Sequence, residues 1–122
     1  MKIFFSFLKF LCLRKKNIRI KEETNENKYI EFSKEGILLS EGQYSKGTKT
    51  GIWKEYYDNG ILATELNYAE GKLHGIYKSY HENGKIWCIG RYINGCKEGE
   101  FIIYNALGKI SLIQYYNNDV LI

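Results

Sequence analysis

The sequence predicts an all-β protein, a single-layer, twisted antiparallel meander of tandem β-hairpins with a short N-terminal helix or arm. Three observations predict this fold. Glycine and aromatic residues recur with a period of 24 residues, Asn-Gly dipeptides stand inside the pattern, and the chain has 12 glycines and no proline. Asn-Gly favours tight hairpin turns, and the absence of proline leaves every residue able to pair. Units this small are expected to stabilise one another by pairing edge to edge.

The composition places the chain among ordinary folded proteins. It has 122 residues, of which 44% are hydrophobic and 26% charged. This length corresponds to one domain, and the balance is that of a soluble globular protein rather than a disordered one. The composition therefore argues against a multidomain enzyme.

The net charge of +4 lies in an N-terminal arm, residues 1–26. The arm holds seven basic and three acidic residues, whereas the rest of the chain holds eleven of each. Because the basic excess belongs to the arm and not to a face of the folded body, we expect no binding to DNA or RNA.

The arm combines an apolar run with a basic cluster. The run from Ile3 to Leu13 is too short to span a bilayer, which needs about 20 residues. As a helix it would suit an anionic membrane surface. The predicted membrane-contact residues are Phe4, Phe5, Phe7, Leu8, Phe10, Leu11, Arg14, Lys15 and Lys16. Packing of this helix on the sheet is one alternative, and a degenerate export signal interrupted by Lys9 is another.

Four copies of the repeat follow the arm without an insertion, at residues 27–50, 51–74, 75–98 and 99–122. Each copy is expected to form one hairpin. The recurring positions are Gly51, Gly75 and Gly99; Gly36, Gly60, Gly84 and Gly108; Tyr44, Tyr68, Tyr92 and Tyr116; Tyr29, Trp53, Tyr77 and Phe101; and Phe32, Tyr56, Tyr80 and Tyr104. Aromatic ladders across neighbouring strands are the expected role of these rings.

The hairpin turns are predicted at the Asn-Gly dipeptides. Asn59-Gly60 and Asn83-Gly84 suit a two-residue type I′ turn, in which residues 58 and 61 would pair. The first and fourth copies have Glu35 and Leu107 in place of the Asn, so their turns are expected to be looser.

The pattern Gly-x-Trp-x-x-Tyr-x-x-Asn-Gly at residues 51–60, followed by Tyr-x-x-Gly at 68–71, resembles the bacterial variant of the MORN repeat. Such repeats occur in the antitoxin family typified by the YwqK protein. The match is best over residues 51–95 and fades in the first copy, where Asn27 replaces the leading glycine, and in the fourth. The resemblance implies a twisted sheet that acts as a binding platform, and hence a non-enzymatic interaction protein that binds and neutralises a toxin.

Strand alternation separates an aromatic face, on which it also places Leu62, Ile86 and Ile110, from a second face whose character changes along the chain. The second face is polar in the second copy but apolar in the third and fourth. The predicted partner-binding residues on it are Tyr80, Trp87, Ile89, Ile102, Tyr104 and Ile113. A partner protein, a second copy of the chain or the arm is expected to cover them. Strong twist, or a bulge that turns some of them inward, is the alternative.

The last strand is expected to be an open edge. It ends at Asp119-Val120-Leu121-Ile122 and could accept another strand, so self-association through this edge is possible. The alternative to the antitoxin function is a peripheral membrane scaffold held to anionic lipid through the arm.

Residues suited to catalysis or metal binding are few. His74 and His81 lie too far apart along a strand to share a metal ion. The three cysteines, Cys12, Cys88 and Cys96, lack a metal-binding spacing and favour a reducing compartment, with a Cys88–Cys96 disulfide as the alternative. We therefore expect no enzyme activity, no cofactor and no metal, and a cytoplasmic protein, peripheral at the membrane if the arm binds lipid.

Overall fold

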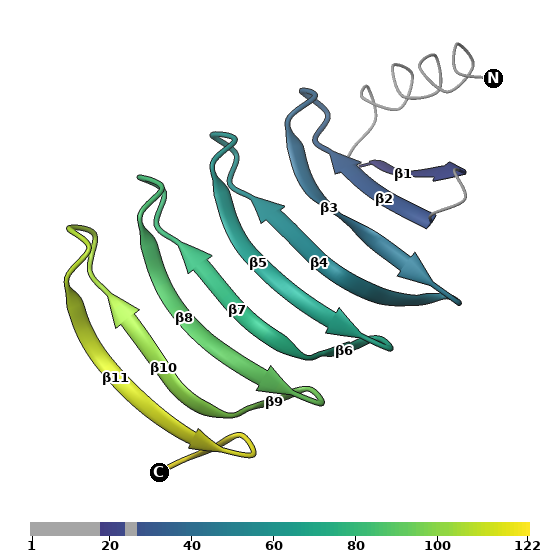
Figure 1. Ribbon diagram of the computed structural model, residues 1–122. Coiled ribbons are helices and arrows are strands. Elements are labelled where there is room, and N and C mark those ends of the chain that lie inside the picture. Colours follow the sequence, from purple (N-terminus) through teal and green to yellow (C-terminus); the bar gives the residue numbers. More distant parts are fainter. Residues whose placement is uncertain (1–17, 24–26) are drawn as a thin grey trace.

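The protein is a single curved layer of β-strands (Figure 1). The structure, a computed structural model, describes the backbone of residues 18–23 and residues 27–122. Within these ranges twelve strands form one antiparallel sheet whose order follows the sequence. The predicted fold class is confirmed. The helix expected in the arm, and all nine predicted membrane-contact residues, lie outside the described residues.

Strand bounds follow the 24-residue period. The strands are β1 (Ile18–Glu23), β2 (Asn27–Phe32), β3 (Leu38–Ser45), β4 (Thr48–Tyr56), β5 (Leu62–Ala69), β6 (Lys72–Leu73), β7 (Gly75–Tyr80), β8 (Ile86–Ile93), β9 (Cys96–Lys97), β10 (Gly99–Tyr104), β11 (Ile110–Asn117) and β12 (Val120–Leu121). The four hairpins are β2–β3, β4–β5, β7–β8 and β10–β11. The strands β6 and β9 lead into β7 and β10, so each pair corresponds to the continuous strand β4.

A bulge recurs where one copy joins the next. Between β3 and β4 the register jumps from Gln43 opposite Thr50 to Glu41 opposite Lys54, which leaves two extra residues on β4. Gly51 lies in this bulge with a φ of +67°, a conformation that glycine adopts without steric cost. The glycine at the start of the second, third and fourth copies therefore marks a change in strand direction.

The hairpin tips are three-residue turns, so the two-residue type I′ turn predicted at Asn59-Gly60 is wrong. The N–H of Tyr57 donates to the carbonyl of Ile61 (2.8 Å), and the N–H of Gly60 donates back to the carbonyl of Tyr57 (2.9 Å). Only Gly60 has a positive φ, +83°, while Asn59 does not. This is a type I turn closed by a left-handed glycine.

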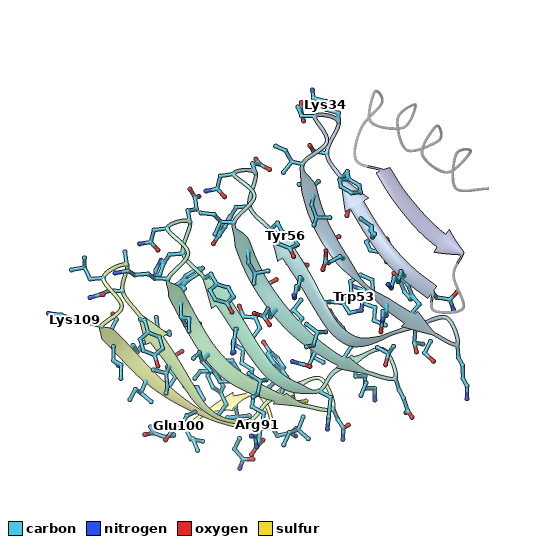
Figure 2. All side chains as sticks on the ribbon, turned by 45° about the horizontal axis from the view of Figure 1, so that its top comes forward. Lys34, Trp53, Tyr56, Arg91, Glu100 and Lys109 are labelled. Atoms are coloured by element: carbon cyan, nitrogen blue, oxygen red, sulfur yellow. The ribbon has the colours of Figure 1, made fainter. Side chains whose placement is uncertain are left out.

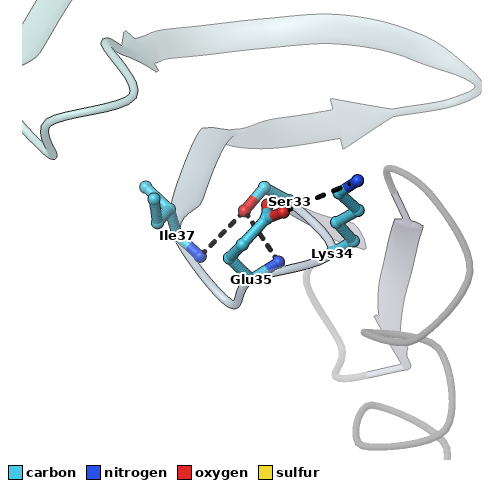
Figure 3. Close-up of polar contacts among 4 residues, drawn as sticks. All are labelled: Ser33, Lys34, Glu35 and Ile37. Carbon is cyan, nitrogen blue, oxygen red and sulfur yellow. Dashed lines mark hydrogen bonds and ion pairs between the residues drawn. The ribbon is translucent and has the colours of Figure 1, made fainter.

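The tips of the first and fourth copies have the same geometry, so the looser turns predicted there are also wrong. Gly36 and Gly108 have φ values of +87° and +86°. The Ser33 hydroxyl accepts the N–H groups of Glu35 and Ile37, both at 3.2 Å (Figure 3). Asn105 makes the equivalent bonds in the fourth copy. A polar residue at the first position of the tip therefore replaces the missing Asn.

Type I′ geometry occurs instead in the links between hairpins. Ile93 pairs with Cys96 across a two-residue loop, in which Asn94 and Gly95 have φ values of +48° and +87°. Lys46-Gly47, Glu70-Gly71 and Asn118-Asp119 have the same pair of positive φ angles.

The packed aromatic face consists of two ring clusters. Tyr29, Trp53 and Phe101 are its buried members. The first cluster contains Tyr29, Tyr44, Trp53 and Tyr68, and the second contains Tyr77, Tyr92, Phe101 and Tyr116, with ring centroids 5.1–6.4 Å apart. Each cross-strand pair contributes about 0.2–1 kcal/mol.

Glycines allow the rings within each cluster to meet. A Cβ on Gly42 would lie 2.1 Å from the Trp53 ring, and one on Gly90 would lie 2.3 Å from the Phe101 ring. Leu66, opposite Trp53, holds the equivalent position between Gly42 and Gly90 and lies at the boundary between the clusters. Lys49 covers Trp53 at 4.3 Å, and Lys97 covers Phe101 at 5.2 Å.

Side chains at the tips bind each copy to the next. The Tyr57 hydroxyl donates to the carbonyl of Tyr80 (2.5 Å), and a ring nitrogen of His81 lies 2.9 Å from the carbonyl of Tyr104. The amides of Asn59 and Asn83 donate to the carbonyls of Glu82 and Ala106, at 3.4 and 2.9 Å. The Asn of Asn-Gly thus connects neighbouring copies instead of adopting a positive φ.

Candidate functional site

A continuous row of residues crosses the second face of the sheet. Direct cross-strand partners share a face, so the pairings define the row. It runs through Ile30, Glu41, Lys54, Glu65, Lys78, Ile89, Ile102 and Ile113. The charges alternate from Glu41 to Lys78, and the last three residues are isoleucines.

Five of the six predicted partner-binding residues lie together. Tyr80 and Tyr104 lie two residues beyond Lys78 and Ile102 on the same strands, so strand alternation places them beside the isoleucines. We name Tyr80, Ile89, Ile102, Tyr104 and Ile113 the isoleucine face. Ile113 is 41% exposed, and the other four are partly exposed. The described residues form no second layer over either side of the sheet (Figure 2).

Tyr80 joins the isoleucine face to the charged part of the row. Its hydroxyl donates a hydrogen bond to the Glu65 carboxylate at 2.6 Å. Burial, and then this hydrogen bond and the nearby negative charge, raise the pKa of Tyr80 from 10.0 to about 12. The hydrogen bond directs the Tyr80 hydroxyl toward the charged part of the row.

Trp87, the sixth predicted residue, occupies a different environment. The register passes from Tyr80 opposite Ile86 to Ser79 opposite Cys88, which leaves Trp87 as the extra residue of a bulge. Its ring lies 5.8 Å from the His81 ring, near the tip, and 49% of the residue is exposed. The bulge interrupts strand alternation at Trp87. The alternation that predicted Trp87 on the same face as Ile89 therefore does not hold there.

This bulge and its equivalents in the second and fourth copies correct the position of three other residues. Alternation from a two-residue turn placed Leu62, Ile86 and Ile110 on the aromatic face, whereas the structure places them directly opposite Tyr56, Tyr80 and Tyr104. Sequence reasoning also missed Ile76 and Tyr115, which are 48% and 46% exposed and share strand parity with Lys78 and Ile113. This spacing along the strand was enough to predict that Ile76 lies on the face of Lys78 and Tyr115 on the face of Ile113.

The described residues do not gather groups suited to catalysis. No three His, Cys, Asp or Glu side chains among them lie close enough to hold a metal ion. His74 accepts the N–H of Asn94 near one end of β7, while His81 lies beyond its other end. Cys88 and Cys96 are free thiols, so the alternative of a disulfide between them is wrong. Burial raises the pKa of Cys88, which keeps this thiol protonated and weakly nucleophilic.

Nor do the described residues include a helix that is long and apolar enough to cross a membrane.

Comparison with known proteins identifies the repeat. The family model described as "MORN repeat variant" matches residues 49–70 and 73–94, within the second and third copies. No curated protein matches the chain. Among solved structures, the "Crystal Structure of TarM" is similar over 99% of this chain and 23% of that chain, with a TM-score of 0.54 and 15% identity. The chain thus spans under a quarter of the length of TarM, and the likeness shows the fold alone.

Proposed function

Because residues 49–70 and 73–94 are MORN repeat variants, a repeat that mediates interactions and is not catalytic, we propose that this chain is a protein-binding module. Its isoleucine face is the proposed binding surface. The observation that carries the proposal is the row of Ile89, Ile102 and Ile113, which lie side by side on a face that the described chain leaves open.

The fold does not require this row to be apolar. In the second copy and its neighbours the same row positions hold Glu41, Lys54, Glu65 and Lys78 on the same backbone. Folded monomers rarely leave a contiguous apolar patch exposed without a function. Aromatic and aliphatic side chains surrounded by polar residues are typical of the centre of a protein interface.

We further propose that the partner is a toxin that this protein neutralises. The support is the resemblance of residues 51–95 to the repeats of the YwqK-type antitoxins, together with the absence of a cluster of catalytic or metal-binding groups in the described residues. In this function the isoleucine face covers a surface that the toxin needs for its activity.

Coexpression with the product of a neighbouring toxin gene tests the proposal. The wild-type chain should restore growth, and Ile89→Glu should not, because an unpaired carboxylate would enter an apolar interface. Ile52→Glu is the matched control, since Ile52 is also exposed (53%) but lies in the first half of the sheet. Equal rescue by Ile89→Glu and Ile52→Glu would rule out the isoleucine face as the binding surface.

The arm supports a second candidate function, attachment to anionic membranes. Its +4 charge and apolar run are the specific observation, and an attached chain would act as a peripheral scaffold. Liposome sedimentation with anionic vesicles should show binding by the full chain and none after deletion of residues 1–21. Undiminished binding by the truncated chain would end this candidate.

A further inference from the structure

Apolar pairs follow one another along the second face, on the side of the hairpin tips. Each copy contributes one aromatic and one aliphatic residue, which are direct partners across the hairpin. The pairs are Phe32–Leu38, Tyr56–Leu62, Tyr80–Ile86 and Tyr104–Ile110. The last two pairs include Tyr80 and Tyr104 of the isoleucine face. We name the first two pairs, Phe32, Leu38, Tyr56 and Leu62, the proximal band.

The proximal band lies on the same face as the charged part of the row. Phe32 and Tyr56 lie two residues beyond Ile30 and Lys54 on the same strands, and all four residues of the band are partly exposed. Beside the band, residues of β2, β3 and β4 that include Glu41 line a hollow of about 490 Å³. Because the described residues form no second layer over this hollow, another segment has room to pack there.

The arm joins the sheet beside the first residue of the band. Ile18, where the described part of β1 begins, pairs directly with Phe32 of β2. The apolar run of the arm, residues 3–13, is joined to Ile18 by a link of four residues, which spans at most about 13 Å. The run is therefore held within reach of the proximal band.

The length of the run matches the width of the band. In a helix the eleven residues of the run would extend over about 16 Å, at 1.5 Å per residue. The band extends from β2 to β5, four neighbouring strands that are separated by three spacings of about 4.8 Å, or about 14 Å in all. A helix that starts at β2 would end before β7, so the isoleucine face would stay open.

The run also has the side-chain pattern that fits an apolar band. Phe4, Phe7, Leu8 and Leu11 follow the spacing i, i+3, i+4, i+7, which places them on one side of a helix. Lys2 and Lys9 would fall on the opposite side. A helix packed through the four apolar residues would therefore keep both ammonium groups in water.

We propose that residues 3–13 pack as a helix on the proximal band and cover the first half of the second face. The tether at β1 sets the orientation of this helix: Leu11 lies near Phe32, and Phe4 lies near Leu62. The apolar side of the helix cannot contact lipid at the same time, so packing on the band competes with attachment to a membrane. The inference goes beyond the proposed function, because the isoleucine face stays open to a partner.

Chymotrypsin cleavage of the full chain in the absence of lipid tests this packing, since the phenylalanines of the run are accessible to the protease only when the run leaves the band. Mass spectrometry should show slow cleavage within residues 3–13 of the wild-type chain. Leu62→Asp places a carboxylate under the helix and should speed this cleavage about tenfold. Ile110→Asp is the matched control, because Ile110 holds the same hairpin position two copies later, and it should leave the rate unchanged.

Disulfide trapping keeps the test decisive if Leu62→Asp does not fold. The native thiols are first removed by Cys12→Ser, Cys88→Ser and Cys96→Ser. In that chain, Phe4→Cys combined with Leu62→Cys should form a disulfide within one copy, because the orientation of the helix brings these two positions together. Phe4→Cys combined with Ile110→Cys should form it at least about tenfold more slowly.

Rapid cleavage of the wild-type run, or equally fast trapping at positions 62 and 110, would overturn the proposal. So would cleavage that slows only when anionic vesicles or a partner protein are added, since the run would then pack on the added surface. A disulfide that joins only separate copies would overturn it as well, because the arm of a second copy would then cover the band. If the packing fails while Ile89→Glu still prevents rescue from the toxin, the proposed function stands.

Discussion

The two halves of the second face place different chemistry on one backbone. From Glu41 to Lys78 the row consists of alternating carboxylates and ammonium groups, and from Ile89 to Ile113 it consists of isoleucines, although the pairing register repeats every 24 residues. Both halves rest on the same kind of aromatic cluster. The comparison teaches that the aromatic face specifies the fold, whereas the second face is free to vary and is where a binding function can reside.

Breaking either aromatic cluster should have the largest effect. Gly42→Ala and Gly90→Ala each place a Cβ within 2.1–2.3 Å of a packed ring, so each should lower the free energy of unfolding by about 3 kcal/mol. Urea denaturation measures this. Gly84→Ala is the control: its φ is +86° but nothing lies near its Cβ, so it should cost about 1 kcal/mol. If the free energy of unfolding falls by a similar amount in Gly42→Ala, Gly90→Ala and Gly84→Ala, then Gly42 and Gly90 are not needed for the close approach of the rings.

Converting the second half of the row to the chemistry of the first should weaken partner binding strongly and leave the fold intact. In the double variant Ile89→Glu, Ile102→Lys the alternating charges continue from Lys78, and opposite-charge pairs support a sheet by about 0.2–1 kcal/mol each. We expect the free energy of unfolding to change by under about 1 kcal/mol and partner affinity to fall about a hundredfold. Calorimetric titration with the partner, beside a denaturation curve, measures both. A folded variant with unchanged affinity would contradict the proposed function.

The contacts between copies should differ in strength at the two junctions. Asn83→Ala removes a 2.9 Å bond to the carbonyl of Ala106 and should cost about 1 kcal/mol, whereas Asn59→Ala removes a 3.4 Å bond and should cost about half as much. Each variant also loses the hydrogen bond that the Asn side chain accepts from a backbone N–H within its own tip. Leu107→Ala, at the same tip position, should change the free energy of unfolding by under about 0.5 kcal/mol. Equal losses for Asn59→Ala and Asn83→Ala would show that the length of the bond between copies is unimportant.

The smallest effect is expected at the contact between the two halves, the hydrogen bond from Tyr80 to Glu65. Because the folded-state pKa of Tyr80 is about 12 against 10.0 in the unfolded chain, the stability that depends on neutral Tyr80 is complete below pH 10 and is lost as the pH rises to 12. In Tyr80→Phe this part of the alkaline decline should disappear. Thermal unfolding midpoints between pH 9 and 12 measure it, with Tyr104→Phe as the equivalent change one copy later. A decline as steep as that of wild type would contradict the assignment to Tyr80.

Much of the isoleucine face could be predicted because strand alternation is robust within a strand. Ile89, Ile102 and Ile113 share a face as predicted because the extra residue in each tip and the bulge beside it together restore the register of a two-residue turn. Ile86 and Trp87 could not be placed, because they lie at the bulge beside the tip. Asn-Gly is compatible with a two-residue and a three-residue turn, and only the observed pairing of Tyr57 with Ile61 distinguishes them.

The sequence by itself determined the repeat, its period, the all-β class, the aromatic columns and the change in chemistry along the second face. These are local properties, set by which residue types recur and by the two-residue period of a strand. The tertiary structure alone decided the bulges at Gly51 and its equivalents, the division of the rings at Leu66 and the pairing of Ile18 with Phe32. Each depends on which residues of neighbouring strands pair, and a pairing register arises only when hydrogen bonds and side-chain packing across several strands are satisfied together.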